Sequence, residues 1–309
     1  MNGRSGISRL LLTALIGFIV GPCSAAQGGR HAPAVHVPIM PPQQTQTIAD
    51  DLGRPFPLPA GMPERIVSMA PNITEILFAL GLGGRVVGVT RFCDWPSEAK
   101  AIPKIGGLVD PNIEVIRSLD PDLVIAFRGN PLRLVDRVRK LGLPVFVLDI
   151  GEELDELFPL IGRIGRVTRT ESRAAELVAG LQSRVAAVDA RLRGALTRPK
   201  VFALLYGQGL WTSGGESYLD DIIARAGGVN VASALPKKWT LYKRERIIKD
   251  DPDVIFVLAR TEADFASGRE RLARTPGMDG VAAVRTGRIF ELDENAASRF
   301  GPRLIDVLV

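Results

Sequence analysis

The three tryptophans, Trp95, Trp211 and Trp239, fall in predicted loops beside a strand end or a turn, and Tyr242 follows closely after the third. In open parallel sheets a ligand lies beyond the carboxyl ends of the strands. These four rings are therefore candidates to line a cleft and to pack against a large flat ligand. The alternative is that one or two of them simply cover a hydrophobic core, and we expect at least one to do so.

Two arginines occupy similar places in two parts of the chain. Arg128 follows a predicted strand that ends at Phe127, and Arg260 follows a predicted strand that ends at Ala259. A guanidinium at such a position could contact acidic groups or amide carbonyls of a ligand. Either arginine could equally be a solvated surface residue.

Patterns typical of catalysis or of direct metal binding are missing from the region predicted to fold. It has no Gly-rich phosphate loop, no nucleophile elbow and no histidine, since His31 and His36 both precede it. A bare zinc or manganese ion usually requires a cluster of histidines and carboxylates. We therefore expect no catalytic residues, no cofactor and no metal held directly by the chain. An exported enzyme that uses paired carboxylates in a cleft is the competing class.

A duplicated segment gives the strongest evidence on architecture. The segment 114–125 matches the segment 245–256 at a constant offset and without a gap. Each copy has a helical turn that opens with a glutamate (Glu114 or Glu245), an Asp-Pro-Asp corner and a buried strand. Proline ends the helix and the aspartates suit the turn. Two copies favour two related lobes, although an acid near a helix N-terminus also has a local role, worth about 0.3–1 kcal/mol.

The pattern of elements around this duplication predicts an α/β fold. Two similar lobes, each with a mostly parallel sheet, are bridged by one long proline-free helix, and a ligand cleft lies between them. The predicted strands are 66–69, 86–89, 123–127 and 145–148 in the first lobe and 201–206, 254–258 and 289–292 in the second. The predicted segments are a signal peptide (1–26), a Pro-rich linker (27–63), the N-terminal lobe (64–167), the bridging helix (168–197) and the C-terminal lobe (198–309).

The N-terminus predicts export. A basic start, an apolar run over 10–20 and the small residues 24–26 are typical of a secretory signal, which places the protein in the periplasm or another exported location. A lipid anchor at Cys23 is the less favoured alternative, because Pro22 precedes the cysteine where a small residue is expected. The formal net charge of +5 is too small to favour nucleic acid as a partner.

The folded region resembles the helical-backbone metal receptor group, the binding proteins of ABC importers for cobalamin, ferric siderophores and haem. The resemblance covers nearly all of residues 64–303, and it lies in the order and spacing of several short motifs. They are Arg65-Ile66-Val67-Ser68 with Pro71-Asn72 and Thr74-Glu75, Val86-Val87-Gly88-Val89, Asp94-Trp95-Pro96, Pro103-Lys104-Ile105-Gly106-Gly107, Asn112-Ile113-Glu114, Leu119-Asp120-Pro121-Asp122-Leu123-Val124 and Gly301-Pro302-Arg303-Leu304.

The resemblance implies a monomeric binding protein whose lobes close little, with a small-molecule metal chelate held between them. It also implies that Glu114 and Glu245, one on each lobe, dock onto arginines of the permease dimer, where carboxylate–guanidinium pairs would fix the register. The segments 92–96 and 127–130 look most like the cobalamin-binding branch, which adds Asp94 to the expected ligand contacts. Cobalamin is therefore expected first, a ferric siderophore second and haem third.

The three ligands make different demands on the protein. Haem would need an axial ligand, for which the candidates are Tyr206, Tyr218, Tyr242, Cys93 or a methionine. A corrinoid or a siderophore brings its metal already coordinated, so the protein needs only shape, aromatic faces and hydrogen bonds.

Overall fold

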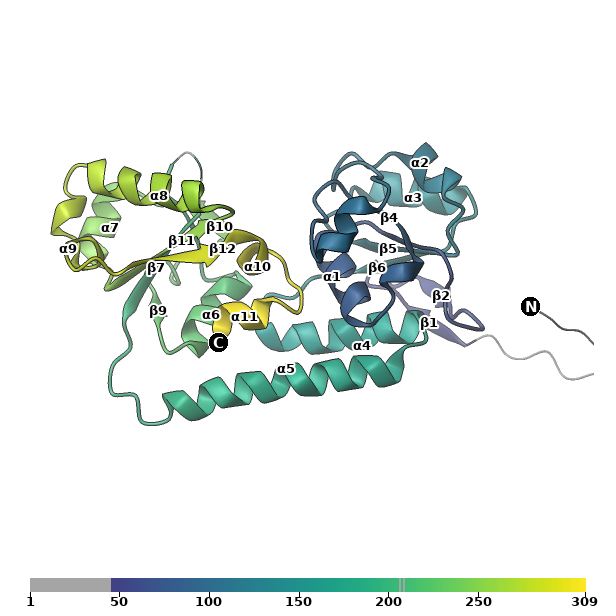
Figure 1. Ribbon diagram of the computed structural model, residues 1–309, viewed down its shortest axis with the longest axis horizontal. Coiled ribbons are helices and arrows are strands. Elements are labelled where there is room, and N and C mark those ends of the chain that lie inside the picture. The colour runs from purple at the N-terminus through teal and green to yellow at the C-terminus, as the bar shows by residue number, and fades with distance from the viewer. Residues whose placement is uncertain (1–45, 206, 208) are drawn as a thin grey trace, which may run out of the picture. The chain divides into compact units, whose positions relative to one another are not determined.

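The computed structural model describes residues 46–205, 207 and 209–309, and these form two α/β lobes joined by the long helix α5 (Glu171–Leu192) (Figure 1). The predicted signal peptide, Cys23, both histidines and Tyr206 lie outside the described residues. Two lobes with parallel sheets and an intervening helix confirm the fold class that the sequence predicts.

The first lobe is built on a four-stranded parallel sheet with the strand order β4-β3-β5-β6. Its strands are β3 (Ile66–Ser68), β4 (Val86–Val89), β5 (Leu123–Phe127) and β6 (Val145–Leu148). Its helices are α1 (Pro71–Ala79), α2 (Ile113–Ser118), α3 (Leu132–Lys140) and α4 (Leu157–Val167), with short 3-10 turns at Gly83–Arg85, Ser97–Ala101 and Leu154–Glu156.

The second lobe repeats this plan with a parallel sheet of order β12-β11-β7-β9. Its strands are β7 (Lys200–Leu205), β9 (Val229–Asn230), β11 (Val254–Ala259) and β12 (Ile289–Asp293), and β8 (Trp211–Ser213) pairs antiparallel with β10 (Trp239–Leu241). Its helices are α6 (Tyr218–Arg225), α7 (Arg244–Asp250), α8 (Glu262–Arg274), α9 (Ala282–Arg285), α10 (Glu294–Ser298) and α11 (Leu304–Leu308), with a 3-10 turn at Met278–Gly280.

The central strands β5 and β11 explain why the matching sequences form matching structures. In β5, Leu123 and Ile125 face the core shared with α1, α4 and α5, whereas Val124 and Ala126 face the core under α2 and α3. Strand β11 divides its residues between two cores in the same alternating way. Both faces of each sheet are covered, so these strands are continuous apolar runs rather than alternating ones.

The Asp-Pro-Asp corner is the same in both lobes. Asp120 and Asp251, the first residue of each corner, have φ values of 44° and 46°. The side chain of the third residue accepts a hydrogen bond from a backbone N–H at the start of the neighbouring strand. Arg65 N donates to Asp122 Oδ1 at 2.9 Å, and Lys200 N donates to Asp253 Oδ2 at 2.8 Å. The duplicated segment therefore ties each helix corner to the next strand of its own sheet.

Helix α5 is shorter than the predicted bridging helix. It has 22 residues, roughly 33 Å at 1.5 Å per residue, and α4 packs along it (Figure 1). Its buried residues Leu181, Val185 and Val188 belong to a core cluster that contains residues of both sheets. The predicted bounds 168–197 were too wide, because Thr168 caps α4 through Ile164 O and no helix continues past Leu192.

The prediction of a linker over residues 27–63 is wrong for the last part of that range. Residues 47–57 form a hairpin of β1 (Thr47–Ala49) and β2 (Pro55–Pro57). Phe56 is buried with its ring 5.2 Å from that of Phe146, and the buried Asp50 is paired with Arg139. The prolines suggested an extended tether, but the partners that order this segment lie about 90 residues away in the chain.

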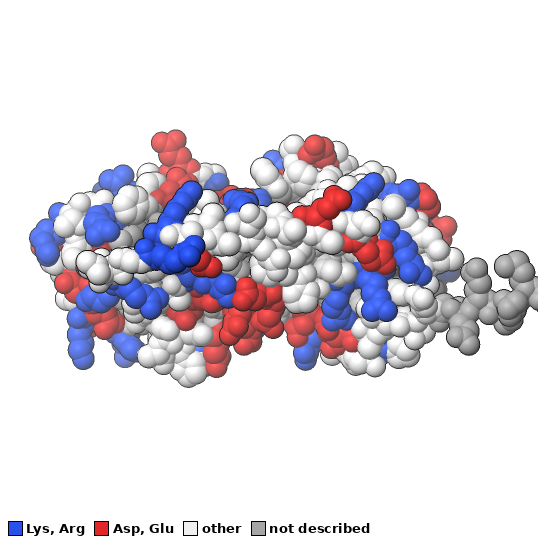
Figure 2. All heavy atoms as spheres, turned by 90° about the horizontal axis from the view of Figure 1, so that it is seen from below, with Lys and Arg blue, Asp and Glu red and all other residues white. Residues whose placement is uncertain are grey.

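Basic and acidic side chains are interspersed on the face shown in Figure 2. Within the described residues, no helix is both long enough and apolar enough to cross a membrane.

Candidate functional site

A cavity of about 250 Å³ lies between the two lobes. The first lobe contributes Ala70, Pro71, Asn72, Phe92, Leu108, Phe127 and Ile150, and the second contributes Arg260, Glu294, Asn295, Ser298, Arg299 and Phe300. Most of these residues lie at or shortly after the carboxyl ends of β3, β4, β5, β6, β11 and β12. This is where an open parallel sheet presents its loops, so the loops of both sheets meet at one cavity.

Phenylalanines form the aromatic part of the cavity wall. Phe92 and Phe127 come from the first lobe, and Phe300 comes from the second, where its ring lies 5.2 Å from that of Tyr218. Phe92 is 45% exposed, and the Cζ of Arg91 lies 5.0 Å from the centroid of its ring. The wall therefore offers apolar ring surface to whatever enters the cavity.

The tryptophans predicted to line a cleft do not line this cavity. Trp95 is exposed and lies against the guanidinium of Arg303, with 4.7 Å between the Arg303 Cζ and the ring centroid. Both belong to a neighbouring hollow of about 380 Å³ that also includes Glu75. Trp211 and Trp239 lie on the β8–β10 ribbon, the first exposed and the second packed against the core.

Tyr242 is a core residue, contrary to the expectation that it lines the cleft. It is 3% exposed, its ring lies 5.7 Å from that of Phe202, and its hydroxyl donates to Val231 O at 3.0 Å and to Asp250 Oδ2 at 2.5 Å. Burial, reinforced by the Asp250 carboxylate, raises the pKa of Tyr242. The side chain turns inward because a buried acceptor pair satisfies its hydroxyl there.

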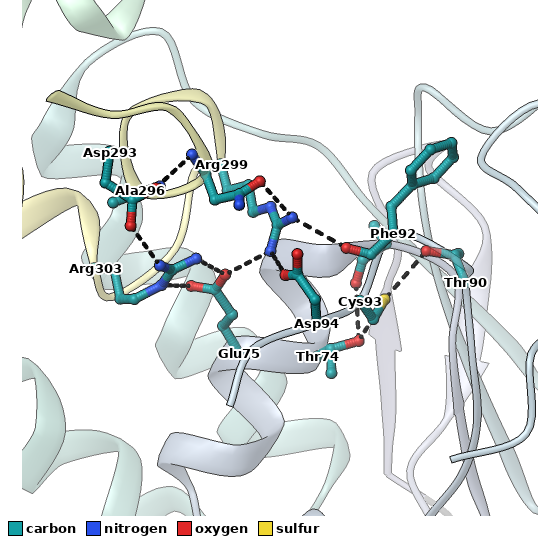
Figure 3. Close-up of polar contacts among 12 residues, drawn as sticks. Thr74, Glu75, Thr90, Phe92, Cys93, Asp94, Asp293, Ala296, Arg299 and Arg303 are labelled. Atoms are coloured by element: carbon teal, nitrogen blue, oxygen red, sulfur yellow. Dashed lines mark hydrogen bonds and ion pairs between the residues drawn. The ribbon is translucent and has the colours of Figure 1, made fainter. Parts of the chain in front are cut away.

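A network of charged residues connects the lobes beside the cavity (Figure 3). We call it the interlobe joint, and its members are Glu75, Asp94, Asp293, Arg299 and Arg303. Arg303 Nη2 donates to Glu75 Oε1 at 2.7 Å, and Arg303 Nε donates to Glu75 Oε2 at 3.1 Å. Arg299 Nη1 donates to Asp94 Oδ1 at 2.5 Å. Two arginines of the second lobe are thus held by two acids of the first.

Arg299 is the member of the joint that also lines the cavity. Its Nη2 donates to Phe92 O at 3.0 Å and to Asn295 Oδ1 at 2.7 Å. Burial opposes ionisation of Asp94, but the hydrogen bond and the charge of Arg299 outweigh it and hold the pKa of Asp94 below its usual range. Asp94, a predicted ligand contact, is therefore an acid that positions Arg299 rather than a lining residue.

The two predicted arginines come from different lobes, and only one of them lines the cavity. Arg260 lines the cavity, and its Nη2 donates to the buried Glu294 Oε1 at 2.7 Å. That hydrogen bond and the charge of Glu294 raise the pKa of Arg260. Arg128 follows the lining residue Phe127, but its exposed side chain pairs with Asp149 at 2.8 Å. Of the predicted ligand contacts, Arg260 is in the wall and Arg128 is beside it.

Three candidate axial ligands for haem iron, Cys93, Tyr218 and Tyr242, lie in or against a hydrophobic core. Cys93 is 2% exposed and bonded to Thr74 and Thr90, and burial raises the pKa of its thiol. Burial also raises the pKa of Tyr218. Among the described residues, no three His, Cys, Asp or Glu side chains come together as they would around a metal ion.

The two predicted docking glutamates occupy equivalent, exposed positions. Glu114 lies in the first turn of α2 and Glu245 in the first turn of α7. Glu245 pairs with Arg244 at 2.8 Å, and its own backbone N–H, followed by Arg244, lowers the pKa of its carboxyl. Neither side chain is held by a distant segment in any contact of the described residues, so both are available at the surface.

The sequence did not predict several residues of the wall, among them Asn72, Phe92, Phe127, Glu294, Arg299 and Phe300. A signal was present for four of them, since Asn72, Phe92 and Phe127 lie in segments that carry the family resemblance and Glu294 directly follows a strand. Arg299 and Phe300 follow the short helix α10 and had no such signal. The rings that line the cavity are those of phenylalanines, and none of the three tryptophans is among the lining residues.

Comparison with known proteins gives a consistent result. The family model for periplasmic binding proteins matches residues 66–296. The vitamin B12-binding protein of Yersinia pseudotuberculosis serotype O:3 is 32% identical over 202 residues, which are 65% of this chain and 71% of the relative.

Two solved structures extend the comparison to three dimensions. The periplasmic haem-binding protein RhuT of Roseiflexus sp. RS-1, in its apo form, has 32% identity and a TM-score of 0.73, over 79% of this chain and 95% of its own. The periplasmic vitamin B12-binding protein BtuF of Vibrio cholerae has 26% identity and a TM-score of 0.68, over 80% and 94%. These relatives are binding proteins for metal-containing ligands.

Proposed function

Because this chain belongs to the periplasmic binding protein family, we propose that it captures a metal chelate between its lobes and delivers it to the permease of an ABC importer. The ligand proposed first is cobalamin or a related corrinoid. The chain acts as an exported monomer that binds without catalysing a reaction, and its first 26 residues serve as the signal peptide. A lipid anchor at Cys23 is the less favoured form of export.

The observation that carries this proposal is the composition of the cavity wall. Three phenylalanine rings supply apolar surface, while the polar groups are arginine, glutamate, asparagine and serine side chains. The described residues of the wall include no His, Tyr, Cys, Met or Lys, the side chains that ligate haem iron most readily. A ligand whose metal is already saturated suits such a wall, because it needs only ring contact and hydrogen bonds.

The size of the cavity bears on how the ligand would be held. About 250 Å³ is below the roughly 300–1,000 Å³ of sites that enclose a drug-sized ligand. A corrinoid would therefore insert one edge and rest its remainder on the rim, where Arg128 lies. This mode of binding is compatible with lobes that stay joined, because the ligand need not be engulfed.

Haem, expected third from the sequence, is an alternative that a specific observation favours. The haem-binding protein of Roseiflexus sp. RS-1 is as similar to this chain in sequence as the vitamin B12-binding protein of Yersinia pseudotuberculosis is. A ferric siderophore, expected second, remains the other alternative, since it too carries its metal already coordinated.

The ligand proposal is tested by titrating the purified full chain with cyanocobalamin, haem and a ferric hydroxamate siderophore. Calorimetry gives the three dissociation constants. We expect the tightest binding for cyanocobalamin, and tighter binding of haem would replace corrinoid by haem in the proposal. Binding of none of the three would contradict the proposed ligand class.

The docking proposal uses Glu114 and Glu245, the equivalent exposed acids of the two lobes. A symmetric pair of acids suits a permease dimer, because each lobe can meet one subunit through the same kind of carboxylate–guanidinium contact. The charge-reversal experiment described in the Discussion tests this proposal separately from the identity of the ligand.

A further inference from the structure

Asn72 is one of the residues that line the cavity, and its side chain has a hydrogen-bond donor without a partner. The residue is only 6% exposed, and its Nδ2 has no acceptor among the described residues. Buried amide donors are nearly always bonded, because leaving one unmade costs the desolvation of the group. A donor left over in the wall of a cavity therefore points to an acceptor that enters with the ligand.

The position of Asn72 in its helix strengthens this argument. It is the second residue of the nine-residue helix α1, whose N-cap residue Ala70 offers no side-chain cap. Ala70 and Pro71 also line the cavity, so the helix begins at the cavity wall. The N–H groups of a first helical turn have no acceptor within the helix, and the helix dipole makes that end partially positive. The site thus favours an oxygen atom that accepts hydrogen bonds.

The charges of the wall indicate which kind of oxygen. Arg299 is balanced by Asp94 at 2.5 Å, and Arg260 is balanced by Glu294 at 2.7 Å. The Glu294 carboxylate itself lines the cavity. Among the described lining residues, each cation already has an acid beside it, so an incoming carboxylate would lose its hydration without gaining a free cation as partner. An uncharged carbonyl oxygen meets no such penalty.

We propose that Asn72 donates from Nδ2 to an uncharged carbonyl oxygen of the ligand, such as that of a carboxamide. It thereby acts as a residue that selects neutral polar ligands over ligands that present carboxylates. The inference deepens the proposed function and rests on it, since it assigns a specificity determinant within the same cavity.

Asn130 provides the matched contrast. It is also a buried asparagine of the first lobe, 2% exposed, but its amide is fully used. Its Nδ2 donates to Met69 O at 3.2 Å and Leu108 O at 2.9 Å, and its Oδ1 accepts from Phe127 N at 3.0 Å. Asn130 holds the loops in place, whereas the Nδ2 of Asn72 has no acceptor among the described residues.

The binding test compares Asn72→Ala and Asn72→Asp with the wild type by calorimetry, using cyanocobalamin, whose ring carries carboxamides, and haem, which carries two carboxylates. Loss of one neutral hydrogen bond should weaken cyanocobalamin binding about 3- to 10-fold in Asn72→Ala. The loss should be larger in Asn72→Asp, where a carboxylate would face the carbonyl oxygen. Haem affinity should not fall in Asn72→Ala, and the control Ser172→Ala, which alters an exposed residue of α5 outside the cavity, should leave both affinities unchanged.

Stability of the ligand-free protein provides the second readout. Asn72→Ala removes an unbonded donor, so the urea midpoint should stay the same or rise, whereas Asn130→Ala should lower it. A residue with a purely structural role would not combine unchanged stability with weaker binding.

Three outcomes would overturn the inference. These are unchanged cyanocobalamin affinity in Asn72→Ala, a lower urea midpoint in that variant comparable to that of Asn130→Ala, or a greater loss for haem than for cyanocobalamin. If the wild type binds neither ligand, the assignment of a corrinoid fails and this inference fails with it. That result is distinct, because it is already evident before any variant is measured.

Discussion

Arg303 of the second lobe donates two hydrogen bonds to the buried carboxylate of Glu75 in the first lobe, at 2.7 Å and 3.1 Å. The side chains of Glu75 and Arg303 are 3% and 13% exposed. Gly301 allows this approach, since a Cβ there would lie 3.2 Å from Glu75 Oε2. The joint therefore fixes the separation of the lobes on the side where the cavity wall also includes Arg299.

Removing Glu75 should destabilise the protein strongly. Glu75→Ala leaves Arg303 buried without its main acceptor, a change that typically costs about 3–5 kcal/mol of unfolding free energy. Urea denaturation measures the change. The control Glu98→Ala removes an exposed acid near the same hollow and should stay within about 0.5 kcal/mol of the wild type. A small effect of Glu75→Ala would mean that the joint contributes little to stability.

Stability should also depend on pH through Asp94. Its pKa is lowered in the folded state, so its stabilising contribution is present above the unfolded value of about 3.9 and is lost as the pH falls through the folded value. Urea midpoints of the wild type and of Asp94→Asn should therefore differ at pH 6 and converge as the pH drops below about 4. Since the side chain of Asp94 is 42% exposed, solvent screening should keep the difference small. A constant gap between the two proteins across this range would contradict the assignment.

Phe92 should matter for binding more than for folding. Its exposed ring contributes little to the core, so Phe92→Ala should lower affinity for the ligand roughly tenfold while the urea midpoint changes little. Calorimetry with cyanocobalamin gives the affinity. Phe290→Ala is a matched control, because Phe290 is 47% exposed but lies outside the cavity. Equal effects of the two substitutions would show that the phenylalanine wall is not a binding surface.

Reversing the charges of Glu114 and Glu245 should abolish delivery without affecting capture. We expect the double variant Glu114→Lys/Glu245→Lys to keep its ligand affinity and its unfolding free energy within about 0.5–1 kcal/mol, since both side chains are exposed. Transport into vesicles that contain the cognate permease should fall to background. Glu262→Lys changes an exposed acid in the first turn of another helix and should transport normally. Normal transport by the double variant would limit the two glutamates to a role at the helix ends.

The sequence by itself determined most strands of the two parallel sheets, the repeat and the class of fold, but not β8, β9 or β10. Buried parallel strands are continuous apolar runs, so β4 and β5 begin and end where the pattern predicts them. The Asp-Pro-Asp corners were also readable, because their turn chemistry acts over a few residues. The sequence did not predict the hairpin of β1 and β2, whose ordering depends on ion pairs and ring contacts with later helices and strands.

Only the tertiary structure decided which side chains form the site. Asp94 and Arg299 are 205 residues apart in the chain, and nothing local to either residue indicates that they meet. Tyr242 and Phe92 both lie in connecting segments, yet one ring turns into the core and the other toward the cavity. That direction depends on which distant groups pack against the loop or accept its hydrogen bonds. Local sequence can therefore place a residue at the edge of a sheet, while the contacts made across the two lobes determine whether it faces a ligand.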